Sequence, residues 1–251
     1  MEPFDGTLAR LATLPGAALD RPWSWRQRET TVREAFYRSL EEEQMALAGL
    51  IPPAGEAARI LALAQRAFSE LRGLLVGLPD ALLDSPPPAG EWSLRTILSH
   101  VLTTERRYAQ HTQYAVQRAD ADPVETPRDR LPPLHGADTP GSLADLLAHL
   151  ATARAETDHA LAGLPDHALA RPTVWAGYQV DVRFRLHRFA AHLIEHTIQG
   201  EKTLEALGVP QTEARRLVRR LAAARGAHER LSGAQQLQAL DAVHADRAGA
   251  L

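Results

Sequence analysis

Long stretches without proline dominate this chain of 251 residues, and their apolar residues recur every three or four positions. Alanine, leucine, glutamate and arginine make up most of these stretches, while alternation of apolar and polar residues is never sustained. A spacing of three to four residues is typical of helices that bury one face, whereas strands need alternation. The sequence therefore predicts an all-α protein.

Proline clusters and glycines separate the helical stretches. Ser93 and Ser142 are expected to cap the starts of two helices, and Gly208 with Pro210 is expected to end another. The segment 123–141 holds five prolines and is too long for a simple turn, so we expect a crossover there. The predicted helices cover residues 28–48, 56–78, 93–118, 141–163, 181–207 and 212–230, with a weaker one at 234–247.

A short motif occurs three times, beginning at Leu14, Leu78 and Leu164. Each copy has a Leu-Pro pair, a loop with tryptophan, and then a long helical stretch. The second and third copies lead into helices that carry histidines, while the first has none at the corresponding position. Two interpretations stay open, namely a structural repeat and a common way of ending a helix.

Composition narrows the class of protein. The chain has no cysteine, which excludes disulfides, thiolate nucleophiles and sulfur-ligated metals. No run of about 18 apolar residues occurs and the N-terminus lacks signal-peptide features, so we expect a cytoplasmic protein without membrane contact. The net charge is -3, and we interpret the arginine cluster as a solvated helix face with no nucleic-acid partner. This cluster consists of Arg215, Arg216, Arg219, Arg220 and Arg225.

Three histidines are candidate metal ligands. His192 and His196 lie four residues apart, which places both imidazoles on one face of a helix. His100, on another predicted helix with an apolar stripe, is the best third ligand. His187 is turned away from His192 by about 140° and is left out. Three imidazoles leave a coordination position open, which is typical of a catalytic site; zinc is the first choice, with nickel, iron or manganese also compatible.

A metal site of this kind is compatible with several reactions. A divalent cation lowers the pKa of bound water to about 7 and also stabilises a thiolate. Leu193 follows His192, so the peptidase motif His-Glu-x-x-His is absent and a peptidase is disfavoured. Glu105, Tyr178 and Asp181 are candidate groups for proton transfer. With eleven histidines in the chain, simple packing of the pair inside a metal-free bundle stays an alternative.

The run from Gly90 to His100, followed by His192-Leu-Ile-Glu-His196-Thr-Ile-Gln, resembles the DinB/YfiT-like superfamily of metalloenzymes. The resemblance covers roughly residues 56–208. It implies a four-helix bundle with a long crossover between its second and third helices. It also implies a divalent metal held by one histidine of the second helix and two of the fourth, which by position are His100, His192 and His196.

The resemblance also sets the expected organisation and function. We expect an N-terminal helical extension over residues 1–55, the bundle with its metal site over 56–210, and a C-terminal helical tail over 211–251. The family implies a metal-dependent transferase or hydrolase that activates a low-molecular-weight thiol or a water on a small-molecule substrate. The alternative is a non-catalytic helical binding or stress-response module with a structural or absent metal. The extensions are candidates for a homodimer interface.

Overall fold

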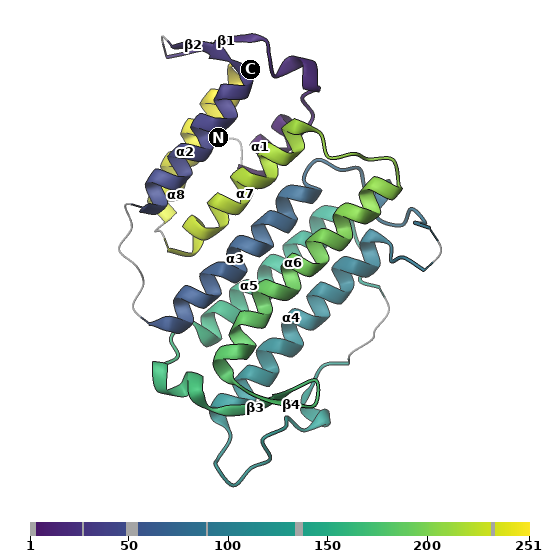
Figure 1. Ribbon diagram of the computed structural model, residues 1–251, viewed down its shortest axis with the longest axis vertical. Helices are drawn as coiled ribbons and strands as arrows, with labels where there is room; N and C mark the ends of the chain where they lie inside the picture. Colours follow the sequence, from purple (N-terminus) through teal and green to yellow (C-terminus); the bar gives the residue numbers. More distant parts are fainter. Residues whose placement is uncertain (1–3, 27, 49–54, 89, 134–137, 232–233) are drawn as a thin grey trace. The chain divides into compact units, whose positions relative to one another are not determined.

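The computed structural model describes residues 4–26, 28–48, 55–88, 90–133, 138–231 and 234–251. The described chain is all-α apart from two short β-hairpins (Figure 1). The elements in chain order are α1 (Phe4–Ala12), η1 (Gly16–Ala18), β1 (Pro22–Trp25), β2 (Arg28–Thr31), α2 (Val32–Ala48), α3 (Glu56–Leu75), η2 (Asp80–Leu82), α4 (Leu94–Gln117), η3 (Arg128–Arg130), α5 (Leu143–Leu161), η4 (Asp166–Ala170), β3 (Pro172–Trp175), β4 (Tyr178–Asp181), α6 (Val182–Ala206), α7 (Glu213–Leu231) and α8 (Ala234–Gly249).

All seven predicted helices are present, and their caps explain several of the bounds. The Ser93 hydroxyl accepts a hydrogen bond from the amide of Thr96 at 3.1 Å, and Ser142 forms a reciprocal capping box with Asp145. Gly208, with φ of +78°, follows the end of α6, a backbone conformation that glycine adopts without strain. The long segment between α4 and α5 contains only the short η3 helix among its described residues.

The chain divides into two compact units. One comprises residues 53–64 and 79–203 and contains α4, α5, α6 and the first turns of α3. Its helices pack through apolar side chains that are almost completely buried, such as Ile97 of α4, Leu150 of α5 and Phe189 of α6. An ion pair between Glu56 and Arg183, with 2.5 Å between nitrogen and oxygen, joins the start of α3 to the start of α6. We call this part the bundle unit.

The other unit comprises residues 1–52, 65–78 and 204–251, and we call it the terminal unit. The segments before and after the bundle therefore belong to one compact unit, together with the second half of α3. Helix α2 packs on α7, and α1 packs on α7 and α8. Leu8, Phe36 and Leu221 lie at the centre of its apolar core. Arg225 is buried here, so the predicted solvated arginine face ends before this residue.

The first and third copies of the sequence motif have the same structure. In each, a 3-10 helix leads into a hairpin of two four-residue strands and then directly into a long helix. The separation is constant at 150 residues, from Pro22 to Pro172 and from Val32 to Val182. The hairpins were missed by the sequence analysis because each has four-residue strands and a turn without an Asn-Gly signal. Arg26 and Ala176 occupy the same left-handed turn position, with φ of 48° and 49°.

Gly226 of α7 provides a test of the packing in the terminal unit. A Cβ atom built at Gly226 would lie 2.5 Å from the Cβ of Ser69 and 2.8 Å from the carbonyl oxygen of Gln65. Ser69 is fully buried on α3, so the neighbours have little room to move. We therefore expect Gly226→Ala to lower the free energy of unfolding by about 1 to 3 kcal/mol, despite the better helix propensity of alanine.

Unfolding in urea, monitored by circular dichroism, measures this free energy. Gly249→Ala is the matched control, because Gly249 is also helical but has no atom within 4 Å of the built Cβ. Equal unfolding midpoints for the two variants would show that α3 and α7 are not packed as closely as described.

Candidate metal centre

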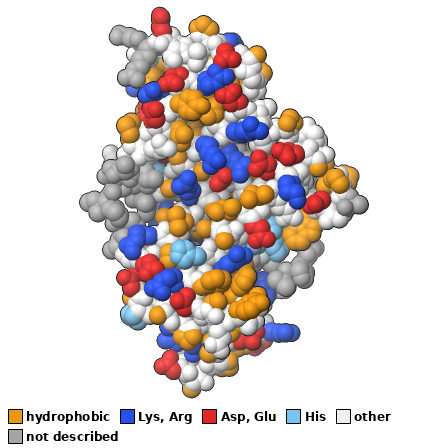
Figure 2. Space-filling view, viewed as in Figure 1, with side chains coloured by type: hydrophobic (Ala, Val, Ile, Leu, Met, Phe, Trp, Pro, Cys, Tyr) orange, Lys and Arg blue, Asp and Glu red, His pale blue; other side chains and the backbone are white. Residues whose placement is uncertain are grey.

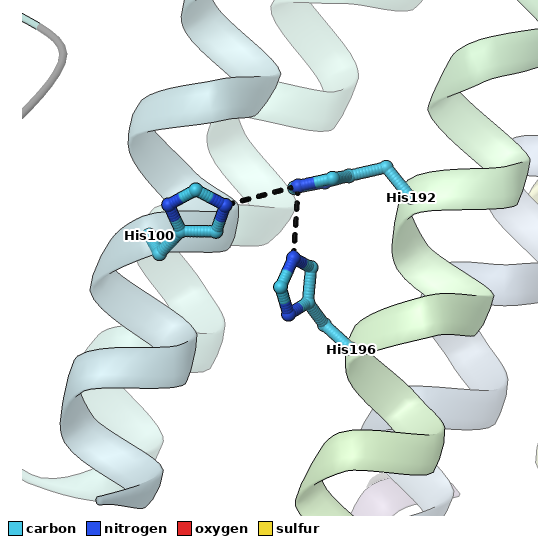
Figure 3. Close-up of side chains that lie close together, drawn as sticks. All are labelled: His100, His192 and His196. Atoms are coloured by element: carbon cyan, nitrogen blue, oxygen red, sulfur yellow. Dashed lines mark hydrogen bonds between the residues drawn. The ribbon is translucent and has the colours of Figure 1, made fainter. Parts of the chain in front are cut away.

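The three predicted histidines meet at one point of the bundle unit, as Figure 3 shows. The Nε2 atom of His192 lies 3.2 Å from Nε2 of His100 and 3.0 Å from Nε2 of His196. His192 and His196 are buried, with 7% and 5% of their surfaces exposed, and His100 is half-buried. One ligand atom from each residue lies within 4.8 Å of the others, which makes the group a candidate metal centre.

Helix geometry explains how these side chains meet. His192 and His196 are separated by about one turn of α6, so their rings project from the same face. His100 lies on α4, next to the buried residues Ser99 and Val101. Trp92, just before α4, stacks on His196 with 6.2 Å between ring centroids and meets His100 edge-on at 5.0 Å. The indole thus restricts the two rings on one side.

The three imidazoles fit a divalent metal ion. Tetrahedral coordination with metal–nitrogen bonds of 2.0–2.1 Å separates two ligand nitrogens by about 3.3 Å, close to the two Nε2 distances found here. The Nδ1 atom of His196 lies 2.7 Å from the side-chain oxygen of Gln199. If Nδ1 carries the proton and donates to that oxygen, Nε2 of His196 presents a lone pair to the centre. A cation is the group that satisfies lone pairs converging in this way.

Burial keeps the imidazole of His192 in the form that binds a metal. Loss of hydration, together with the nearby His196, His100 and Arg188, lowers the pKa of His192 to about 3. The imidazole of His192 is therefore neutral at physiological pH, which is the form that coordinates metals.

The centre lies in a pocket of about 360 Å³. Arg107 and Tyr108 of α4 and Arg188 and Glu195 of α6 line it beside the histidines. His111 also lines the pocket, and burial together with Arg185 and Arg107 lowers its pKa to about 4, so its ring is neutral. Among the described lining residues, the two arginines face a single carboxylate, which favours an anionic ligand.

Glu105, a predicted proton-transfer residue, lies outside the lining of this pocket. Its buried carboxylate accepts hydrogen bonds of 2.7 Å from the guanidinium of Arg154 and the hydroxyl of Thr157, both on α5. Burial raises the pKa of Glu105, while Arg154 and Thr157 act in the opposite direction. Arg154 lies over the ring of Phe189 at 5.5 Å, so the ion pair supports the helix that bears His192.

The other two predicted proton-transfer residues lie on β4 and also do not line the pocket. Tyr178 is 69% exposed. The carboxylate of Asp181 accepts a hydrogen bond of 2.8 Å from the amide of Phe184 in the first turn of α6. Asp181 therefore stabilises the start of the helix that carries two ligands.

Several residues around the centre were missed by the sequence analysis. Arg188 precedes His192 by four residues, Gln199 follows His196 by three, and Tyr108 follows His100 by eight. Each of these separations returns to the same face of a helix. Helical spacing from the predicted ligands was therefore a usable signal for these three residues.

A comparison with known proteins identifies a family match over the part of the chain that contains the three histidines. A family model described as the DinB superfamily matches residues 63–199, more than half of the chain. A search of curated proteins finds no match. None of the helices in the described residues combines the length and hydropathy required to cross a membrane.

Gln199 tests whether the His196 ring is held for metal binding. Removing its side-chain oxygen in Gln199→Ala frees the ring and its tautomer, so we expect Zn²⁺ affinity to fall by about 10- to 100-fold. Gln199→Glu keeps an oxygen acceptor and should retain most of the affinity.

Competition with a chromophoric chelator measures both variants at neutral pH. Circular dichroism checks that each variant keeps its helices. Equal Zn²⁺ affinity for Gln199→Ala and the unchanged protein would show that this hydrogen bond does not prepare the site.

Proposed function

Because the chain belongs to the DinB superfamily and three of its histidines converge in one pocket, we propose that it is a divalent-metal-dependent enzyme acting on a low-molecular-weight thiol. His100, His192 and His196 would hold the metal, for which zinc is the first choice because three imidazole ligands suit it well. The observation that carries the proposal is the position of this triad at the wall of a pocket lined by arginines.

The metal would supply Lewis acidity, which lowers the pKa of a water or thiol held beside it. The protein's own side chains would bind and orient the substrate. Arg107 and Arg188 are the two cations of the pocket lining, and a guanidinium binds a carboxylate through two parallel hydrogen bonds. The preferred thiol would therefore carry a carboxylate.

A thiol suits the pocket better than a water does. Hydrolysis benefits from a general base close to the attacking water. Glu195 is the one carboxylate among the described lining residues, but its side chain is 62% exposed and lies 3.8 Å from Arg188. The ordinary pKa of a thiol, about 8.5, is far below that of water, so a thiol at the centre ionises more readily without such a base. Transfer of sulfur to a second small molecule is therefore the preferred reaction, with hydrolysis as the second candidate.

Groups that line the pocket are better placed for proton transfer than Glu105, Tyr178 or Asp181. The ring of Tyr108 lies 5.5 Å from that of His192, measured between centroids. His111 is held by Thr126, with 2.9 Å between Nδ1 and the hydroxyl oxygen. We assign Tyr108 and His111 as candidate proton carriers and Glu105 as a residue that positions α6.

The proposal is tested with the Co²⁺-substituted protein and two thiols of similar size. We expect 3-mercaptopropionate to give a sulfur-to-cobalt absorption band and to bind more tightly than 2-mercaptoethanol, which lacks the carboxylate. Arg188→Met should weaken binding of 3-mercaptopropionate by about tenfold through the lost charged hydrogen bonds. Binding of 2-mercaptoethanol should change little.

Arg106→Met is the matched control, because Arg106 lies on α4 next to Arg107 but is exposed and does not line the pocket. Two results would contradict the proposal. A cobalt spectrum unaffected by either thiol would favour a metal that only links α4 to α6, as in a non-catalytic module. Equal weakening of both thiols by Arg188→Met would show that this arginine does not bind the carboxylate.

A further inference from the structure

The terminal unit contains a second copy of the structure that carries the metal ligands. Residues 15–48 and 165–198 align without a gap, with a 3-10 helix, a hairpin and a helix in each. An equivalent backbone hydrogen bond of 3.1 Å is present in both copies. The amide of Val32 donates to the carbonyl of Arg21, and the amide of Val182 donates to the carbonyl of Arg171. The copies are therefore equivalent residue by residue.

This equivalence shows what the first copy has in place of the metal ligands. Glu42 of α2 corresponds to His192, and Ala46 corresponds to His196. The Glu42 carboxylate is already paired with the guanidinium of Arg247 on α8. The described residues form no second group with metal-ligand geometry besides the histidine triad. The first copy is therefore not a second metal centre of the same kind.

A pocket nevertheless lies on the corresponding face of α2. Glu42 lines it as His192 lines the metal pocket, and Arg38 lines it as Arg188 does. Its volume is about 790 Å³, larger than that of the metal pocket. All its lining residues belong to the terminal unit. The apolar part of its wall consists of Trp23, Trp25, Leu240 and Val243.

The polar part of the wall carries three arginines and three glutamates, and one of the glutamates is unpaired in the described chain. Three lining arginines are each paired with carboxylates, as Arg26 is with Asp246 and Arg247 is with Glu42. Arg38 pairs with Glu34 and Glu41. Glu29 also lines the pocket, and its carboxylate has no ion-pair partner in the described part of the chain. The lining charges balance, and the one without an ion-pair partner among the described residues is negative, which favours a cationic ligand.

The aromatic wall already binds cations. The guanidinium of Arg26 lies 4.3 Å from the centroid of the Trp25 ring, and that of Arg247 lies 4.5 Å from it. These are cation–π contacts, and ammonium groups are attracted to an indole in the same way. Trp23 and Trp25 stack with 10° between their planes and 6.3 Å between their ring centroids.

Three buried polar atoms on the residues of this wall have no hydrogen-bond partner among the described residues. Oε2 of Glu42 is a buried acceptor without a hydrogen bond, and Nε1 of Trp23 and Nε of Arg247 are buried donors without one. Trp23 is 7% exposed, and leaving such a donor unpaired is costly. Two residues of this wall thus keep an unsatisfied donor, and a third keeps an unsatisfied acceptor.

We propose that this pocket binds a small organic amine in its ammonium form, with an apolar body beside the charge. The ammonium would lie near Glu29 and Glu42, and the apolar body against Trp23, Leu240 and Val243. The terminal unit would then be a ligand-binding counterpart of the metal unit, derived from the same local structure but without its metal. The proposal does not depend on the reaction at the histidine triad.

The experiment uses the full chain and two probes that differ in charge. L-phenylalaninamide carries an ammonium group and a carbonyl, while N-acetyl-L-phenylalaninamide has nearly the same body without the charge. Nuclear magnetic resonance of the four tryptophan indole N–H groups locates the binding. We expect L-phenylalaninamide to bind at least about tenfold more tightly and to shift the signals of Trp23 and Trp25 but not those of Trp92 and Trp175.

Two charge-neutralising variants test the role of the carboxylate. Glu29→Gln should weaken L-phenylalaninamide binding several-fold, whereas Glu125→Gln, an exposed change in the bundle unit, should leave it unchanged. Because Glu29 is exposed and unpaired, this variant is expected to fold. Equal affinity for both probes, no loss with Glu29→Gln, or shifts confined to Trp92 and Trp175 would each overturn the proposal.

Discussion

Convergence of three imidazoles in a partly buried pocket is the constraint on which the bundle unit depends. The Nε2 atoms lie about 3 Å apart. Their positions require α4 and α6 to lie side by side, with the correct turn of each helix facing the other. Apolar contacts and the buried pair of Glu105 with Arg154 hold these helices, and Gln199 and Trp92 fix the rings. The helices and their caps thus position the Nε2 atoms of the three histidines.

The sequence predicted the helices and the ligands because both depend on local spacing. Proline clusters limit the helices, Ser93 and Ser142 cap them, and a separation of four residues places His192 and His196 together. The helix at Phe4–Ala12 and both hairpins were missed, since each is short and its turn residues give little signal. The partnership of Glu105 with Arg154 depends on how α4 packs on α5, which no local pattern contains.

The structure shows which copies of the repeated Leu-Pro motif have the same fold. The sequence linked the second and third copies through the histidines they deliver, but the first and third copies share the hairpin and the register. The same local structure therefore occurs in two chemical forms. On α6 it presents histidines to a centre, and on α2 it presents Glu42 to a guanidinium. Local sequence sets this supersecondary structure, while a few side chains on one helix face decide what it binds.

The metal content of the purified protein tests the central claim most directly. Elemental analysis of protein prepared without a histidine tag should find about one divalent metal ion per chain. His192→Ala should remove it, because two remaining imidazoles bind weakly. His187→Ala, a change at an exposed histidine of the same helix, should keep it. Full metal content in His192→Ala, or none in the unchanged protein after incubation with Zn²⁺, would contradict a metal centre at this histidine triad.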